Sequence, residues 1–176
     1  MDRKEIESVL ETFRIIVDTR EQETPKARKR YRLMKRTERA TLDFGDYAGN
    51  IDIGGVPIHD TAARIKAPCV IERKMSLDEL AECFTRGRAR FEREFQRARD
   101  AGSKVYLLVE DASYEDILLH RYRSKFATTA FIGSIISWSI RYNMTPVFCR
   151  AETSGVIIRE ILLRDMKARL EEGEYG

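Results

Sequence analysis

The chain has 176 residues, of which 43% are hydrophobic and 35% are charged, and its formal net charge is +3. This length predicts a single domain over residues 1–176, with its core at about 13–170. No apolar run approaches the roughly 20 residues that span a bilayer, so we expect no membrane partner. The N-terminus lacks an apolar signal segment, and Cys69, Cys83 and Cys149 lack CxxC spacing, which together predict a cytoplasmic protein with reduced thiols.

Short extended segments dominate the first half of the chain. The basic segment that begins at Pro25 predicts an exposed loop, which resumes as a strand at residues 31–35. The Gly- and Pro-rich stretch at residues 50–68 predicts a hairpin or a long loop. β-branched runs and apolar–polar alternation predict strands at residues 14–18, 41–47 and 68–74.

Helices and strands alternate in the second half. Ser76, with Glu79 three residues later, forms a capping box, which predicts a helix that Gly87 interrupts. The continuous apolar run at residues 104–110 is typical of a strand covered on both faces. The remaining predicted elements are helices at residues 114–120, 127–142 and 154–170 and a strand at residues 145–149. This alternation predicts an α/β fold. The sequence holds neither GxGxxG nor GxxxxGKS/T, so we expect no nucleotide cofactor.

Basic side chains gather in two segments. Residues 25–39 hold eight Lys and Arg residues against the single acid Glu38, and residues 86–99 hold six arginines. Clustered cations of this kind are typical of a surface that binds nucleic acid. Each cluster taken alone is equally typical of a solvated face, and the second also alternates with acids that form helical ion pairs.

Acidic residues lie at or just after several predicted strands: Asp18, Glu21, Asp46, Glu72 and Asp78. Glu72 and Lys74 are two apart on a strand, so their side chains leave the same face, while Arg73 points away. A carboxylate beside an ammonium, facing a second carboxylate from Asp46, suits Mg²⁺ or Mn²⁺ and its bound water. Lys74 would position that water or stabilise charge on a phosphate. This donor set predicts phosphodiester hydrolysis.

Each of these residues has a purely structural interpretation when it is taken alone. The Glu72–Lys74 spacing also fits a cross-strand ion pair. Asp46 follows a glycine, as turn residues often do. Asp78 lies in the first turn of a predicted helix, where an acid interacts favourably with the helix dipole.

Three motifs in a fixed order favour the catalytic interpretation. They are VDTRE at residues 17–21, GDY at 45–47 and ERKMSLDEL at 72–80. Together they resemble the XPF/Hef-type structure-specific endonucleases, a branch of the PD-(D/E)xK nuclease superfamily. The pattern of that family is a GD dipeptide, a variable gap, and ERK followed three residues later by Asp. The resemblance extends from about Ile15 to the last predicted helix.

The resemblance implies a role for each motif residue. Asp46 and Glu72 would bind Mg²⁺ or Mn²⁺, with Asp18 near the metal and Lys74 at the attacking water, which makes these four the predicted catalytic residues. Arg73 and Asp78 would support the site or the DNA backbone, and Arg20 and Glu21 would lie at its rim. The basic clusters would supply DNA contacts that position the substrate without reading its sequence, from Arg28, Arg30, Arg86, Arg88 and Arg90.

The resemblance also implies a fold and a partner. The fold would be the restriction-endonuclease-like nuclease fold, with a central, mostly parallel sheet flanked by helices. Family members commonly dimerise through a helical face, for which residues 127–142 are the candidate here, although simple burial explains their apolar pattern equally well. The tandem helix-hairpin-helix domain that usually follows is not found, so we expect an XPF-like nuclease domain on its own.

The leading hypothesis is therefore a Mg²⁺- or Mn²⁺-dependent DNA endonuclease. Its substrate would be branched, flap or fork DNA in repair or recombination, and in a bacterium or phage it would associate with the nucleoid. One alternative is a non-catalytic DNA-binding subunit that acts beside a nuclease partner. Another is a PD-(D/E)xK exonuclease or restriction-type nuclease, which products from circular DNA would distinguish.

Overall fold

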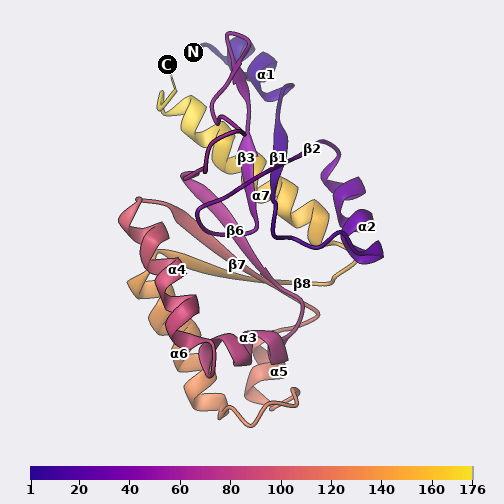
Figure 1. Ribbon diagram of the computed structural model, residues 1–176, viewed down its shortest axis with the longest axis vertical. Helices are drawn as coiled ribbons and strands as arrows, with labels where there is room; N and C mark the ends of the chain where they lie inside the picture. Colours follow the sequence, from indigo (N-terminus) through magenta and orange to yellow (C-terminus); the bar gives the residue numbers. More distant parts are fainter. Residues whose placement is uncertain (176) are drawn as a thin grey trace.

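The computed structural model describes residues 1–175 (Figure 1). The helices are α1 Arg3–Leu10, α2 Pro25–Met34, α3 Leu77–Phe84, α4 Arg88–Asp100, α5 Tyr114–Leu118, α6 Thr128–Arg141 and α7 Ser154–Glu171. The strands are β1 Arg14–Asp18, β2 Thr37–Ala40, β3 Tyr47–Asn50, β4 Asp52–Ile53, β5 Val56–Pro57, β6 Cys69–Lys74, β7 Lys104–Glu110 and β8 Met144–Cys149. Within the described range, no helix has both the length and the apolar character to cross a membrane.

A six-stranded sheet in the order β2-β1-β3-β6-β7-β8 forms the centre of the molecule. β1 pairs with β2 in parallel, and β6, β7 and β8 pair in parallel with one another. β3 lies antiparallel to both of its neighbours, β1 and β6. Five strands therefore share one direction and β3 runs against them, which confirms the predicted α/β fold with a mostly parallel sheet flanked by helices.

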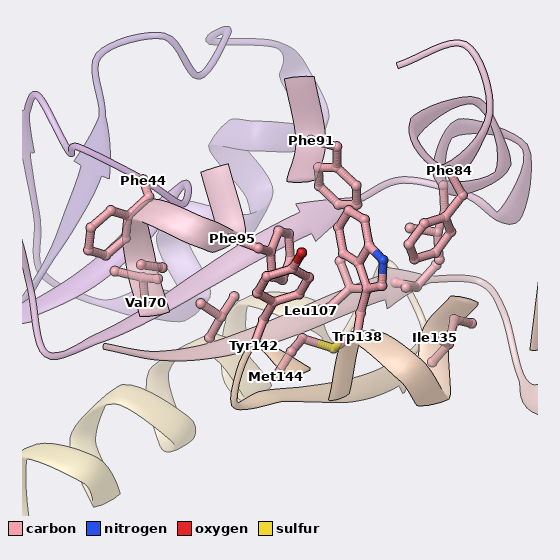
Figure 2. Packing of buried hydrophobic residues seen from close by; sticks show 14 of the residues in the cluster. Phe44, Val70, Phe84, Phe91, Phe95, Leu107, Ile135, Trp138, Tyr142 and Met144 are labelled. Atoms are coloured by element: carbon pink, nitrogen blue, oxygen red, sulfur yellow. The ribbon is translucent and has the colours of Figure 1, made fainter. Parts of the chain in front are cut away.

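One face of the sheet carries an aromatic core (Figure 2). Val70 of β6 and Leu107 of β7 pack in a cluster with Phe91 and Phe95 of α4 and Trp138 of α6. The ring centroids of Phe91 and Phe95 each lie 5.2 Å from that of Trp138. Aromatic pairs of this kind contribute about 0.5–1.5 kcal/mol each beyond their burial. This core fixes α4 against β6, the strand that carries the ERK motif.

The opposite face is covered by α1, α2 and α7. Ile71 of β6 and Leu108 of β7 each follow a residue of the aromatic core, and successive side chains of a strand point to opposite faces. They pack with Met34 of α2 and with Ile158 and Leu162 of α7. Both faces are thus buried, which explains why β6 and β7 contain continuous apolar runs.

The basic segment after β1 folds as helix α2, so the predicted exposed loop and the strand at residues 31–35 are wrong. Thr24 caps the helix, since its side chain accepts the N–H of Ala27 at 3.1 Å, and Pro25 occupies the first turn. The buried side chains of α2 are Ala27, Arg30 and Met34. The apolar stripe is too sparse to give a helical pattern, and an arginine occupies one of its positions.

One further predicted strand is wrong, and the other segments differ from expectation mainly at their ends. The predicted strand at residues 41–47 is wrong over most of its length, because β2 ends at Ala40 and β3 begins at Tyr47. The hairpin predicted within residues 50–68 is confirmed as the pair β4–β5, which turns at Gly54 and Gly55. The remaining predicted helices and strands are confirmed with small shifts at their ends, and α1 is an additional helix.

Candidate active site

The turn before β3 brings Asp46 to the middle of β6. The N–H of Asp46 donates to the carbonyl of Ile71 at 2.8 Å, and the N–H of Asp18 donates to the carbonyl of Asp46 at 2.9 Å. These two bonds fix Asp46 between the carboxyl end of β1 and the middle of β6. The N–H of Arg73 donates to Oδ2 of Asp46 at 2.7 Å, so the ERK strand also orients the carboxylate itself.

The turn requires glycine at position 45. Gly45 has φ +75°, a conformation that L side chains rarely adopt. A Cβ atom built on it would lie 2.9 Å from Cβ of Val70 and 3.3 Å from the carbonyl oxygen of Ile71. The GD dipeptide therefore has a physical cause, since only glycine lets the chain pass this close to β6 and then present Asp46.

Asp46, Glu72 and Lys74 line one cavity of about 390 Å³. Nζ of Lys74 lies 2.5 Å from Oε1 of Glu72, as expected for two side chains that leave the same face of a strand. Both side chains are largely buried. The structure thus brings together the two carboxylates and the ammonium that the motifs predict.

The charges that line the cavity shift the pKa values of Asp46 and Lys74. Burial and the nearby charge of Glu72 raise the pKa of Asp46 well above the ordinary aspartate value. Burial disfavours the charged form of Lys74, but the carboxylates of Glu72 and Asp46 outweigh it and raise the pKa of this ammonium. Two carboxylates that repel one another in a buried cavity form a site whose energy a bound cation would lower.

The donor set fits a hard divalent cation. In residues 1–175, the contacts of Asp46 and Glu72 engage one oxygen each, Oδ2 and Oε1, which leaves a second oxygen of each carboxylate for a ligand. No group of three or more His, Cys, Asp or Glu side chains with metal-binding spacing occurs among these described residues. Mg²⁺ often uses only one or two carboxylates and takes its other ligands from water and substrate phosphate, so two are sufficient.

Arg20 and Glu21, the residues expected at the rim, line the cavity, and so does Arg73. Arg73 bridges two acids, with Nη2 at 3.5 Å from Glu21 and Nη1 at 3.3 Å from Glu110. Glu21 also accepts the hydroxyl of Tyr47 at 2.7 Å. These contacts join the VDTRE, GDY and ERK motifs into one network at the same edge of the sheet.

Two of the predicted acidic site residues, Asp18 and Asp78, do not line the cavity. Asp18 is buried, with Oδ1 accepting Nε of Arg20 at 2.6 Å and Oδ2 accepting the N–H of Leu42 at 2.8 Å. Its carboxylate thus orients Arg20, and the expectation that Asp18 lies near the metal stays a prediction. Asp78 accepts the N–H groups of Arg123 and Ser124, both at 2.8 Å, and so ties the start of α3 to the loop before α6.

The arginines predicted to contact DNA lie in four environments. Arg28 and Arg86 are exposed, on α2 and just after α3, and Arg90 lines the cavity. Arg88 lies over the ring of Trp138, with its guanidinium carbon 5.7 Å from the ring centroid. Arg30 is only 6% exposed and pairs with Glu110 at 2.9 Å, so its expected place on a DNA-facing surface is wrong.

Apart from Arg90, the motifs miss five residues of the cavity wall: Glu82 and Cys83 of α3, Gly87, and Phe91 and Glu94 of α4. Burial together with the charge of Glu72 raises the pKa of Glu94. One signal was present in the sequence. Glu94 lies beside Phe95 and three residues after Phe91, at the border of an apolar helical stripe, where an acid is unusual.

Comparison with known proteins identifies a family and a fold. Residues 17–158 match the model of the ERCC4 domain family. The chain is similar to XPF from Aeropyrum pernix, with a TM-score of 0.62 and 17% identity, over 92% of this chain and 69% of that one. It is also similar to XPF from Aeropyrum pernix in a complex with DNA, with a TM-score of 0.60 and 18% identity, over 88% of this chain and 65% of that one. No curated protein matches the sequence significantly.

These similarities establish the fold and the family. At 17–18% identity the structural likeness shows the restriction-endonuclease-like fold, as the motif order predicted. The family match spans most of the chain and includes the VDTRE, GDY and ERK motifs. The chain therefore belongs to the ERCC4 domain family.

Proposed function

We propose that this chain is a metal-dependent DNA endonuclease that hydrolyses phosphodiester bonds in branched, flap or fork DNA. The observation that carries the proposal is the shared cavity of Asp46, Glu72 and Lys74 in a chain of the ERCC4 domain family. The similarity to XPF from Aeropyrum pernix in a complex with DNA supports DNA as the partner.

Each cavity residue has a distinct task in this proposal. Asp46 and Glu72 would hold Mg²⁺ or Mn²⁺, which when bound polarises the scissile phosphate and lowers the pKa of its water. Lys74, held by Glu72, keeps an ammonium where negative charge develops on the phosphate. Arg20 and Arg90 at the rim would contact neighbouring phosphates and fix the position of the strand.

The direct test is cleavage of labelled flap, fork and linear duplex DNA, and of closed circular DNA, with Mg²⁺ or Mn²⁺ and with a chelator. Asp46→Asn and Lys74→Ala are compared with wild type, and Glu152→Gln is the matched control because Glu152 is exposed and does not line the cavity. We expect metal-dependent cleavage that falls by about 100-fold or more in the first two variants and is kept in the control. Nicking of circular DNA distinguishes an endonuclease from an exonuclease. Equal cleavage by all four proteins would contradict the assignment.

A second candidate function is that of a non-catalytic DNA-binding subunit. One observation favours it: Lys74 already neutralises Glu72. In that case wild type would bind DNA in a salt-sensitive, metal-independent manner and would cleave none of the substrates.

We also propose that two copies of the chain pair through α6. Ile136 and Ile140 of this helix are 50% and 82% exposed, and apolar side chains so exposed favour a partner surface. Sedimentation of wild type and of Ile140→Glu tests this proposal. A dimer that dissociates in the variant supports it, and a wild-type monomer at high concentration excludes it.

A further inference from the structure

Three arginines from distant parts of the chain converge on Leu42 and Asp43, directly before the GD turn. Arg20, which lines the cavity, donates from Nη2 to the carbonyl of Leu42 at 3.2 Å. Arg97 of α4 donates from Nη2 to the carbonyl of Asp43 at 3.1 Å. Arg64, from the segment between β5 and β6, donates from Nη1 to Oδ1 of Asp43 at 3.0 Å. A basic cluster therefore begins at the rim of the cavity and extends away from it.

Helix α4 connects the far end of this cluster to the cavity. Arg90, Arg93 and Arg97 follow one another at spacings of three and four residues, which places them on one face of the helix. All three are exposed, and Arg90 also lines the cavity. In the part of the chain that the structure describes, the arginines of this segment that pair with acids are Arg86 and Arg99. Helical ion pairs therefore leave the charge of the row unneutralised.

The charges of the cluster are arranged with the cations outermost. The side chains of Arg20 and Arg64 are 56% and 62% exposed, whereas that of Asp43 is only 12% exposed. Each guanidinium uses only some of its N–H donors on protein groups, so others face solvent. Guanidinium groups in this arrangement suit the oxygens of a polyanion such as a phosphodiester backbone.

We propose that Arg64, Arg93 and Arg97 form a track for the phosphate backbone of a DNA duplex, continuing from Arg20 and Arg90 at the cavity rim. The helix rises about 10 Å from the first to the last arginine of its row, which corresponds to about three phosphates along one strand. The Gly- and Pro-rich stretch before β6 then has a function, because it supplies Arg64 to the far end of the track. The proposal rests on the proposed function in taking DNA as the partner, but it does not require cleavage.

The test is binding of a labelled DNA fork in the presence of a chelator, measured by fluorescence anisotropy at several salt concentrations. Wild type is compared with Arg64→Ala, Arg93→Ala and the double variant. Arg164→Ala is the matched control, because Arg164 is a 70% exposed arginine of α7, the helix that covers the opposite face of the sheet.

The expected result is a change in the slope of the logarithm of the binding constant against the logarithm of the salt concentration. Each lost phosphate contact makes this slope shallower by about one. We expect that change in each single variant, twice that change in the double variant, and none in the control. Arg64→Lys keeps the charge and should keep the slope.

Neutral methylphosphonate linkages in the duplex arm test whether Arg64 contacts DNA directly. At the contacted phosphate, such a linkage should weaken binding by wild type about threefold or more and leave binding by Arg64→Ala unchanged. Equal sensitivity of the two proteins at every linkage would overturn the contact, because Arg64 would then act only through Asp43.

Failure of the track and failure of the proposed function give different results. Equal salt slopes in all the proteins, with metal-dependent cleavage by wild type, would overturn the track and leave the endonuclease function standing. Shallower slopes in Arg64→Ala and Arg93→Ala, with no cleavage by wild type in Mg²⁺ or Mn²⁺, would support the track and contradict that function.

Discussion

The ammonium of Lys74 lies 2.5 Å from Oε1 of Glu72, and neither side chain is more than 10% exposed. Nζ of Lys74 also lies 5.0 Å from the centroid of the Phe91 ring, on α4. A buried charge is costly unless it is paired, so each member of this pair makes the burial of the other tolerable. A substitution in this pair should therefore affect the stability of the fold as well as the chemistry of the cavity.

Removing Lys74 should cost stability as well as activity. Lys74→Ala leaves Glu72 as an unpaired buried carboxylate, and breaking a buried pair typically costs about 3–5 kcal/mol. We expect the double variant Glu72→Gln/Lys74→Ala to recover part of that loss, because the orphaned charge is then absent. Urea unfolding of wild type, both single variants and the double variant measures the coupling. Strictly additive losses would show that the two residues do not interact in solution.

Asp46→Asn should abolish cleavage and yet stabilise the fold. Burial and Glu72 raise the pKa of Asp46, so the fold favours its neutral form, which asparagine imitates while keeping an oxygen for the N–H of Arg73. In chelator at pH 7.5 we expect a gain of about 1 kcal/mol, or about 2–4 °C in melting temperature. The gain should vanish below about pH 3.9, where the carboxyl is neutral in both states. An unchanged or lower melting temperature at pH 7.5 would contradict this electrostatic description.

Arg28 and Arg30 lie two residues apart on α2, but their substitution should affect the stability of the fold to very different extents. Arg30 pairs with Glu110 in the interior, so we expect Arg30→Ala to destabilise the protein by about 3–5 kcal/mol. Arg28 is exposed, so Arg28→Ala should change stability by less than about 0.5 kcal/mol. If α2 contacts DNA, Arg28→Ala should remove about one phosphate contact. The slope of the logarithm of the binding constant against the logarithm of the salt concentration should then fall by about one. Thermal melts and binding titrations at several salt concentrations measure both effects.

His59, which follows the β4–β5 hairpin, should make stability depend on pH. Burial lowers the pKa of His59, although Glu38 opposes the shift, so the fold favours the neutral ring. Its contribution is complete above about pH 6.5 and is lost as the pH falls through the lowered folded value. Because the ring is partly exposed and solvent screens it, we expect at most about 1 kcal/mol, or about 2–4 °C. Between pH 7.5 and pH 5 the melting temperature should fall more steeply for wild type than for His59→Gln. Parallel plots of melting temperature against pH for the two proteins would exclude this role of His59.

The sequence predicted the fold where apolar patterns were strong and missed elements where they were weak. β6 and β7 are covered on both faces, so their continuous apolar runs were recognisable. Helix α2 buries an ion-paired arginine where a helical pattern calls for an apolar residue, and therefore resembled a loop. Helix α1 was overlooked although Asp2 and Glu5 form a capping box. β3 was missed because it contains Gly49 and Asn50, which are poor strand formers. The position of this strand is decided by its pairing with β1.

The site was predictable to the extent that its residues lie in consecutive motifs. Glu72 and Lys74 share a strand face by local geometry alone, and the GD dipeptide places Asp46 beside them. Glu94 reaches the same cavity only because aromatic packing sets the angle of α4 against β6, and that packing is not visible in a motif. Asp18 was assigned to the metal from its motif, but hydrogen bonds to Arg20 and Leu42 occupy its oxygens.

The most direct measurement is the position of Mn²⁺ in crystals of the protein, found from its anomalous scattering. We expect one peak in the cavity, in contact with a carboxylate oxygen of both Asp46 and Glu72, and no such peak in crystals of Asp46→Asn. A cavity without Mn²⁺ at millimolar concentration, or an ion bound only elsewhere, would contradict the assignment of this cavity as a metal-dependent nuclease site.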